Sequence, residues 1–260
     1  IALMIGVFDS GVGGLGVLSH IRRELPGADL LYLADQGRAP YGTRSLDEVA
    51  AISEEVTSWL LGKGATTVVV ACNTASAAAI NRLREIHPSI PFVGMEPAVK
   101  PAAIATKSGV IGVLATAATF QGELYSSVVS RHAPDVQVLN AACPTWVRLV
   151  EAGRVKGREV ERQVAQCLAP LIEGGADVLV LGCTHFPFLR PVIEQLVGST
   201  ITVVDPAPAV ALQVARVHVE EPGEGDLVLV TTASPHRLAR LARDLAGIEP
   251  TRPVLAWSPE

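Results

Sequence analysis

The stretch GKGATTVVVACNT (residues 62–74) returns in altered form as EGGADVLVLGCTH (residues 173–185), and the cysteine of each falls on the cysteine of the other. Each stretch contains a continuous apolar run, which is typical of a parallel strand covered by helices on both faces. An earlier match, IGVFDSG (5–11) with IGVLATA (111–117), precedes the pair at nearly the same offset. The repeat therefore predicts two similar α/β halves that face each other across a cleft.

Further apolar runs alternate with helical patterns along the chain. Because these runs are apolar on both faces, they favour parallel sheets between two layers of helices. The expected fold class is α/β, with two pseudo-symmetric parallel-sheet domains and the active site in the cleft between them. The remaining predicted strands are LMIGVF (3–8), DLLYLAD (29–35), PFVGM (91–95), GVIGVLAT (109–116), DVQVLNA (135–141), TITVVD (200–205) and DLVLVTT (226–232).

The composition indicates a folded chain with a sizeable core. The 260 residues are 49% hydrophobic and 18% charged, and their formal net charge of −5 gives no electrostatic signature for nucleic acid. The N-terminal apolar stretch 1–8 is too short for a signal peptide or a membrane span. We therefore expect a cytoplasmic protein with no nucleic-acid or membrane partner, whose four cysteines remain thiols.

Cys72 and Cys183 each stand where an apolar run ends and a polar turn opens a helical pattern. In open α/β sheets, ligands bind at the carboxyl ends of strands. A thiol at a helix N-terminus also has its pKa lowered. Two such thiols on opposite walls of a cleft could exchange protons with a carbon acid bound between them. One thiolate would take the proton and the other thiol would return one to the opposite face, which inverts the configuration without a cofactor.

The cysteines also allow other interpretations, namely a metal site or small buried side chains. Cys72, Cys183 and His185 could bind a metal, but zinc sites usually have more closely spaced ligand pairs and no fourth ligand stands out. We therefore expect neither a metal nor a cofactor. Cys143 and Cys167 are expected to be small buried side chains.

The glycines of VFDSGVGGLGVL (7–18) fit the spacing G-x-G-x-x-G, and Asp35 ends the next apolar run. This pattern is typical of a dinucleotide site. A pyrophosphate here would lie beside Asp9, however, and the two negative charges would repel. An ammonium group suits Asp9 better, so we interpret this loop as one wall of an amino-acid site. The alternative role for Asp9 is a helix N-cap.

Five blocks of the sequence resemble, in order, the signature blocks of the glutamate racemases within the cofactor-independent aspartate/glutamate racemase superfamily. The resemblance covers nearly the whole chain and implies interconversion of L- and D-glutamate, which supplies D-glutamate for peptidoglycan of the cell wall. The runner-up activity is that of a related racemase or isomerase acting on aspartate, a hydantoin or a maleate-like diacid. An amino-acid or nucleotide sensor without turnover is a further alternative. The blocks are GVFDSGVGGLGVL (6–18), YLADQGRAPYGTRS (32–45), VVACNTASA (69–77), LGCTHFP (181–187) and VVDPAPAVA (203–211).

The resemblance also implies the domain organisation. Residues 98–204 would form the second domain, inserted into a discontinuous first domain made of residues 1–97 and 205–260. A homodimer is typical of the relatives.

The resemblance assigns roles to the individual residues of the site. Cys72 would take the α-proton from D-glutamate with the help of Asp9, and Cys183 would take it from L-glutamate. His185 and Glu151 would assist Cys183, although Glu151 could equally be a solvated residue at a helix end. The implied substrate contacts are Asp9, Ser10, Cys72, Asn73, Thr74, Thr116, Thr119, Cys183, Thr184 and His185, together with Pro40, Tyr41 and Gly42, whose backbone would receive the side-chain carboxylate.

Overall fold

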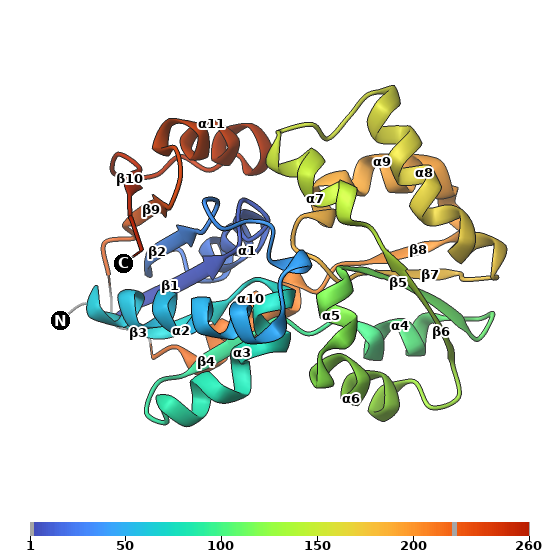
Figure 1. Ribbon diagram of the computed structural model, residues 1–260, viewed down its shortest axis with the longest axis horizontal. Coiled ribbons are helices and arrows are strands. Elements are labelled where there is room, and N and C mark those ends of the chain that lie inside the picture. Colours follow the sequence, from blue (N-terminus) through green and yellow to red (C-terminus); the bar gives the residue numbers. More distant parts are fainter. Residues whose placement is uncertain (1–2, 220–222, 260) are drawn as a thin grey trace.

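The computed structural model describes residues 3–219 and 223–259, so the first two residues of the predicted N-terminal strand region lie outside it. Within the described residues, ten strands form two separate sheets in which every pairing is parallel (Figure 1). The six-stranded sheet has the order β10-β9-β2-β1-β3-β4 and the four-stranded sheet the order β6-β5-β7-β8. The strands are β1 (Met4–Asp9), β2 (Asp29–Ala34), β3 (Ala65–Val70), β4 (Phe92–Gly94), β5 (Val110–Ala115), β6 (Gln137–Ala142), β7 (Val178–Leu181), β8 (Thr202–Val204), β9 (Leu227–Thr231) and β10 (Leu255–Ala256).

Each of the nine apolar runs overlaps one of these strands, so the predicted α/β class with parallel sheets is confirmed. No apolar run predicts β10, which is two exposed residues long. No helix in residues 3–219 and 223–259 is long and apolar enough to cross a membrane.

The strand order agrees with the internal repeat. The order β2-β1-β3-β4 in the first sheet corresponds to β6-β5-β7-β8 in the second. The residues before the two repeated cysteines make the same bond: Ala71 N–H donates to Phe8 O, and Gly182 N–H donates to Leu114 O. The two cysteines therefore occupy corresponding positions at the carboxyl ends of corresponding strands.

Helices cover both faces of each sheet, as the doubly apolar strands require. In the first half, α1, α10 and α11 pack on one face, and α2 and α3 on the other. In the second half, α8 and α9 pack on one face, and α4 and α6 on the other. The helices are α1 (Leu15–Glu24), α2 (Leu46–Gly62), α3 (Asn73–Ile86), α4 (Val99–Ala105), α5 (Ala117–Gln121), α6 (Glu123–His132), α7 (Pro144–Glu151), α8 (Arg158–Glu173), α9 (Arg190–Val197), α10 (Ala207–Val217) and α11 (Pro235–Ala246), with short 3-10 turns at Tyr41–Thr43, Phe186–Leu189 and Gly198–Thr200.

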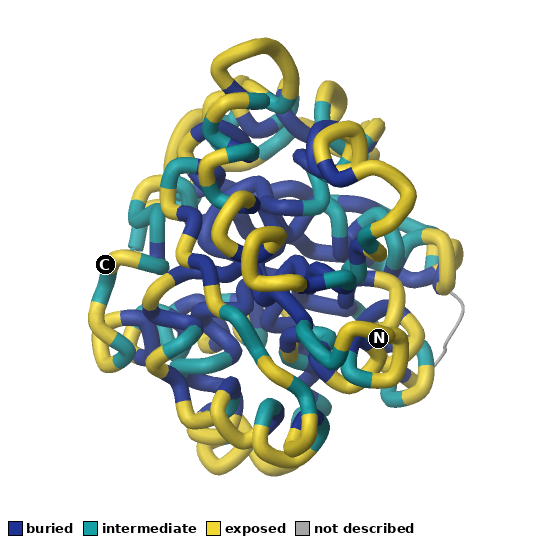
Figure 2. The backbone as a smooth tube through the Cα atoms, turned by 90° about the vertical axis from the view of Figure 1, so that its right-hand side faces the viewer, coloured by how far each residue is buried: buried dark blue, intermediate teal, exposed yellow. Residues whose placement is uncertain are grey.

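The interior of the molecule is continuous between the halves. One buried apolar cluster joins α1 and α10 of the first half to α7, α8 and α9 of the second. Figure 2 shows the buried chain concentrated in the middle of the molecule, with exposed segments around it. This shared core fixes the carboxyl ends of the two sheets relative to each other.

Cys143 and Cys167 form a disulfide, so the expectation that all four cysteines remain thiols is wrong for this pair. Cys143 precedes α7 and Cys167 lies on α8, with their Cα atoms 6.2 Å apart. That separation is within the range a disulfide spans. The sequence predicts only small buried side chains at both positions, because the spacing of the two cysteines does not reveal that the two elements meet. Cys72 and Cys183 are free and buried.

Candidate active site

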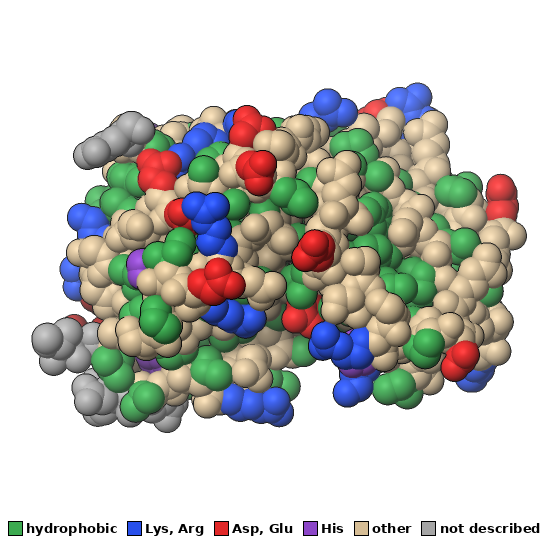
Figure 3. Space-filling view, turned by 60° about the horizontal axis from the view of Figure 1, so that its bottom comes forward, with side chains coloured by type: hydrophobic (Ala, Val, Ile, Leu, Met, Phe, Trp, Pro, Cys, Tyr) green, Lys and Arg blue, Asp and Glu red, His purple; other side chains and the backbone are tan. Residues whose placement is uncertain are grey.

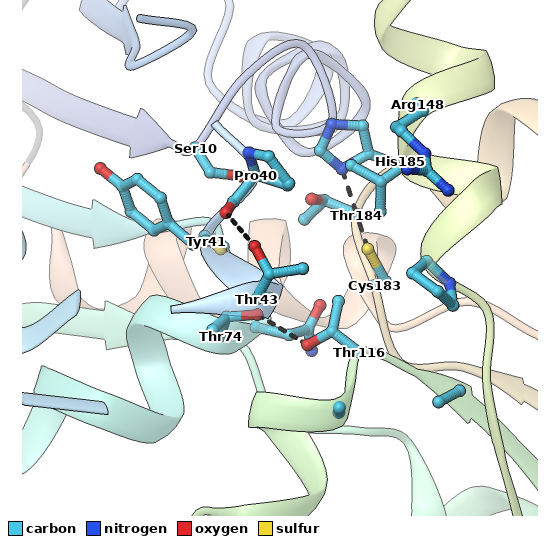
Figure 4. A pocket seen from close by; sticks show the side chains of 17 residues that line it. Ser10, Pro40, Tyr41, Thr43, Thr74, Thr116, Arg148, Cys183, Thr184 and His185 are labelled. Carbon is cyan, nitrogen blue, oxygen red and sulfur yellow. Dashed lines mark hydrogen bonds between the residues drawn. The ribbon is translucent and has the colours of Figure 1, made fainter. Parts of the chain in front are cut away.

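A cavity of about 230 Å³ lies between the carboxyl ends of the two sheets, and both cysteines of the repeat line it (Figure 4). Its walls come from both halves of the chain, as the repeat predicts. The residues that line it are Ser10, Pro40, Tyr41, Gly42, Thr43, Cys72, Asn73, Thr74, Thr116, Ala117, Ala142, Pro144, Val147, Arg148, Cys183, Thr184 and His185.

Three of the predicted site residues do not line the cavity but lie behind it. Asp9, Thr119 and Glu151 each hold a lining residue through a hydrogen bond. Six lining residues were not predicted: Thr43, Ala117, Ala142, Pro144, Val147 and Arg148. Thr43 directly follows the predicted Pro40–Gly42 segment and could have been included with it.

A chain of hydrogen-bonding groups begins at Cys183. Its Sγ lies 3.8 Å from Nδ1 of His185, whose Nε2 lies 2.7 Å from Oε1 of Glu151. Burial lowers the pKa of His185, but the hydrogen bonds and charges of Cys183 and Glu151 outweigh this effect and raise the pKa well above its ordinary value. An imidazolium that retains its proton can donate a hydrogen bond to a thiolate beside it and stabilise the negative charge.

Glu151 is not a solvated residue at a helix end. Its side chain is 15% exposed, and it accepts hydrogen bonds from three directions. Besides His185, the donors are Val12 N–H at 2.7 Å and Gln36 Nε2 at 2.9 Å, both from the first half. Burial raises the pKa of Glu151, but these donors and the charge of His185 lower it overall. The carboxylate is thus held charged against His185.

Asp9 is fully buried at the end of β1 and does not cap α1, whose N-cap is Gly14. Its carboxylate accepts Gly11 N–H at 2.9 Å and the Thr184 hydroxyl at 2.9 Å. The second bond crosses between the two halves, next to Cys183. Burial raises the pKa of Asp9, although the charge of His185 and the two hydrogen bonds oppose the increase.

Cys72 begins α3 as its N-cap, 5% exposed, and its Sγ accepts Ala75 N–H at 3.5 Å. Burial raises the pKa of the thiol to about 12, and the negative charge of Asp9 adds to the increase. The expectation of a lowered thiol pKa is therefore wrong for Cys72. The reason is that one weak N–H bond at the helix start does not offset burial beside a carboxylate.

The glycines of the first loop allow the halves to approach closely. A Cβ on Gly11 would lie 1.8 Å from Oε1 of Glu151, and a Cβ on Gly13 would lie 2.4 Å from the Thr184 hydroxyl oxygen. These positions must lack a side chain for Glu151, Thr184 and His185 to reach their places. The spacing that resembles a dinucleotide fingerprint thus serves contact between the halves. Asp35, the acid of that fingerprint, instead accepts from the hydroxyls of Tyr41 and Thr232 and from Arg38.

The polar side chains of Asn73, Thr74 and Thr116 line the cavity as well and offer hydrogen-bonding groups to a ligand. The side-chain amide of Asn73 is 3% exposed, and neither its nitrogen nor its oxygen has a hydrogen-bond partner in the structure. A buried amide of this kind needs a partner. The hydroxyls of Thr74 and Thr116 lie 2.9 Å apart, and Thr119 bonds to Thr116 from behind. Thr116 lines the cavity and Thr119 does not, so the structure distinguishes two threonines that the sequence alone could not distinguish.

Comparisons with known proteins agree with this geometry. The sequence model of the Asp/Glu/hydantoin racemase family matches residues 10–214. The chain is 49% identical to the glutamate racemase of Roseiflexus sp. (strain RS-1) over 93% of its own length and 91% of that protein. Among solved structures, a glutamate racemase isoform of Bacillus anthracis superposes with a TM-score of 0.88 at 33% identity, covering 99% of this chain and 97% of that one. The Escherichia coli glutamate racemase solved with L-glutamate and the activator UDP-MurNAc-Ala superposes with a TM-score of 0.86 at 29% identity, covering 99% of each chain.

The chain belongs to the Asp/Glu/hydantoin racemase family. It is an amino-acid racemase of the two-domain α/β type. Within the family, the relatives that match over nearly the whole length of the chain are glutamate racemases.

Proposed function

We propose that the chain interconverts L- and D-glutamate by a two-base mechanism in which Cys72 and Cys183 stand on opposite sides of the substrate α-carbon. The observation that carries this proposal is the placement of two buried thiols, at corresponding strand ends of a repeated fold, on one cavity. General acid–base catalysis requires both groups to lie within reach of the reacting carbon, which a small shared cavity provides.

On the second half, Cys183 is proposed to exchange the proton with L-glutamate. His185 lies beside its sulfur and is itself held by Glu151. A protonated His185 stabilises the Cys183 thiolate, because an opposite charge nearby favours the charged form of a titrating group. Glu151 is proposed to orient the imidazole and keep it charged.

On the first half, Cys72 is proposed to exchange the proton with D-glutamate. Its raised pKa makes the thiol a poor base by itself. The ammonium group of bound glutamate would supply a positive charge between Asp9 and Cys72, which favours the thiolate. The carboxylate of Asp9 is proposed to attract that ammonium and to assist deprotonation of Cys72.

The remaining polar residues are proposed to bind the two carboxylates of glutamate. Asn73, Thr74, Thr116 and Thr184 offer side-chain donors, and Asn73 supports this assignment because its amide has no hydrogen-bond partner among the residues that the structure describes. The segment Pro40–Gly42 presents backbone groups to the same cavity. Ser10 and His185 complete the proposed substrate contacts, whereas Thr119 is proposed to hold Thr116 in place. No metal or cofactor takes part in the proposed steps.

The wider role follows from the product. We propose that D-glutamate made by this chain is used for peptidoglycan, in the cytoplasm, by a homodimer. The proposed domains are residues 1–97 with 205–260, and residues 98–204. The sheets support this division, because β1–β4 share one sheet with β9 and β10, and β5–β8 form the other.

The test is the loss of the circular dichroism signal of L-glutamate in the presence of chelator and reductant. The unaltered protein should bring the signal to zero, and Cys72→Ala and Cys183→Ala should not. Cys167→Ala in the same buffer removes a thiol that does not line the cavity and should leave turnover unchanged. If racemisation survived in either of the first two variants, the paired-thiol mechanism would be wrong.

A further inference from the structure

Arg148 is a cationic side chain on the wall of the cavity that the proposed mechanism does not use. It lies on α7, next to Val147 and three residues before Glu151. In Figure 4 it projects on the same side of the pocket as His185 and Cys183. The side chain is exposed, and among residues 3–219 and 223–259 no carboxylate forms an ion pair with it. Six other arginines do have such a partner: Arg38, Arg82, Arg162, Arg190, Arg243 and Arg252.

Arg148 stands where the cavity meets a second hollow. That outer hollow, of about 290 Å³, is lined by Gln36, Ala39 and Arg237, among others. Pro40, Val147 and Arg148 line both spaces, so they form the boundary between them. A ligand that passes from the outer hollow to the cysteines must cross this boundary.

The charges around this passage are unfavourable for an anion in the absence of a local cation. Glutamate carries two carboxylates and one ammonium at neutral pH, so it approaches as an anion, while the protein carries a formal net charge of −5. On the face shown in Figure 3, acidic and basic side chains are interspersed. Asp9 adds negative charge behind the cavity wall, and Glu151 lines the outer hollow together with the cation Arg237.

Arg148 is not among the groups that contribute most to the pKa shifts of His185 and Cys72. The pKa of His185 is shifted by burial and by Cys183 and Glu151. The pKa of Cys72 is shifted mainly by burial, Asp9 and Ala75 N–H. The guanidinium is therefore positioned to act on the substrate as it arrives rather than on the thiols.

We propose that Arg148 is the entrance residue that captures a carboxylate of incoming glutamate and directs it past Pro40 and Val147 into the cavity. This inference rests on the proposed function, since it takes the cavity as the glutamate site. A planar guanidinium with no protein partner is suited to this role, because it pairs with carboxylates in a bidentate manner. Local charge at a cleft raises the association rate of an oppositely charged ligand, and salt weakens the effect.

The experiment compares kcat and KM for racemisation in both directions for the unaltered protein, Arg148→Gln, Arg148→Lys and the matched control Arg154→Gln. Arg154 is exposed, lies near the end of the same helix and lines neither hollow. Each measurement is made at about 0.01 M and about 0.15 M ionic strength, where the Debye length is about 30 Å and about 8 Å.

At low ionic strength, Arg148→Gln should lower kcat/KM roughly three- to tenfold through KM, with kcat nearly unchanged. Its kcat/KM should also lose much of the salt dependence of the unaltered protein. Arg148→Lys keeps the charge but not the bidentate geometry, so it should keep the salt dependence and only part of kcat/KM, and Arg154→Gln should behave as the unaltered protein. Capture by Arg148 is overturned if Arg148→Gln keeps the original kcat/KM and salt dependence, if the loss lies in kcat, or if Arg154→Gln loses as much. Failure of the unaltered protein to racemise glutamate would instead refute the proposed function.

Discussion

Replacement of Glu151 by Gln tests the hydrogen-bonded chain that leads to Cys183. The carboxylate accepts from His185, Val12 N–H and Gln36 at 2.7, 2.7 and 2.9 Å. An amide keeps one acceptor oxygen but directs an NH2 group at one of these donors, and it removes the negative charge opposite the imidazole. The pKa of His185 should therefore fall in the variant, since Glu151 is one of the groups that raise it.

The expected magnitude follows from a lost hydrogen bond between charged groups. Such a bond contributes about 1.5–3 kcal/mol, and about 1.4 kcal/mol corresponds to a tenfold change in rate. Glu151→Gln should therefore lower kcat/KM about ten- to hundredfold. Because the two enantiomers have equal free energy, kcat/KM must fall equally in both directions, so the loss alone does not identify the side affected.

The side is identified by isotope effects on kcat/KM with α-deuterated substrates. If Glu151 serves Cys183, proton removal from L-glutamate becomes more nearly rate-limiting in Glu151→Gln, so the isotope effect should rise with L-glutamate and fall with D-glutamate. Glu159→Gln is the matched control, because Glu159 is a surface residue paired with Arg162. Unchanged kcat/KM in Glu151→Gln, or a larger isotope effect with D-glutamate, would refute the assignment.

Three further predictions follow from the same geometry. Gly11→Ala should lower kcat/KM at least about tenfold, because its Cβ would lie 1.8 Å from the Glu151 oxygen. Gly27→Ala is the control and should not lower kcat/KM, because there is open space around Gly27. Equal activities of the two variants would contradict this account of Gly11. Folding stability should depend on pH through the His185–Glu151 pair. Glu151 has a lowered pKa, so its contribution to stability is present above its ordinary pKa of 4.5 and is lost as pH falls through the folded value. His185 has a raised pKa, so its contribution is present below its ordinary pKa of 6.5 and is lost as pH rises through the folded value. The melting-temperature difference between the unaltered protein and Glu151→Gln should thus be largest at mildly acidic pH, and a difference that does not vary with pH would refute the linkage. Reductant should lower the melting temperature by opening the Cys143–Cys167 disulfide, a loss of about 3 kcal/mol, and Cys143→Ser should be insensitive to reductant; a reductant effect of equal size in the variant would point to another cause.

The sequence reveals those parts of the fold that depend on local pattern. The apolar runs predict the nine longer strands, because burial on both faces leaves a continuous hydrophobic signature. The repeat around Cys72 and Cys183 predicts that the two thiols face one cavity. Pairing between distant strands leaves no such local signature. The return of the chain after residue 204, with β9 beside β2, came from resemblance and not from periodicity.

The site could be predicted only in part for a similar physical reason. Residue types at strand ends identify the candidates, but burial decides their chemistry, as the raised pKa of Cys72 shows. Thr116 and Thr119 are equivalent in sequence terms, and only the turn of α5 places one on the cavity and the other behind it. Arg148 gives no signal at all, since an arginine on a short helix is ordinary until the opposite wall at Pro40 is known.

The bonds that cross between the two halves have a consequence for the timing of the reaction. Asp9 holds Thr184, and Val12 and Gln36 hold Glu151, so the groups around each thiol are completed by the opposite half. Any separation of the halves that admits glutamate would break these bonds and disperse the proton relay. The relay would then form only after the substrate is enclosed. Closure of the two halves would thus complete the hydrogen-bonded groups around the thiols only when the substrate is present.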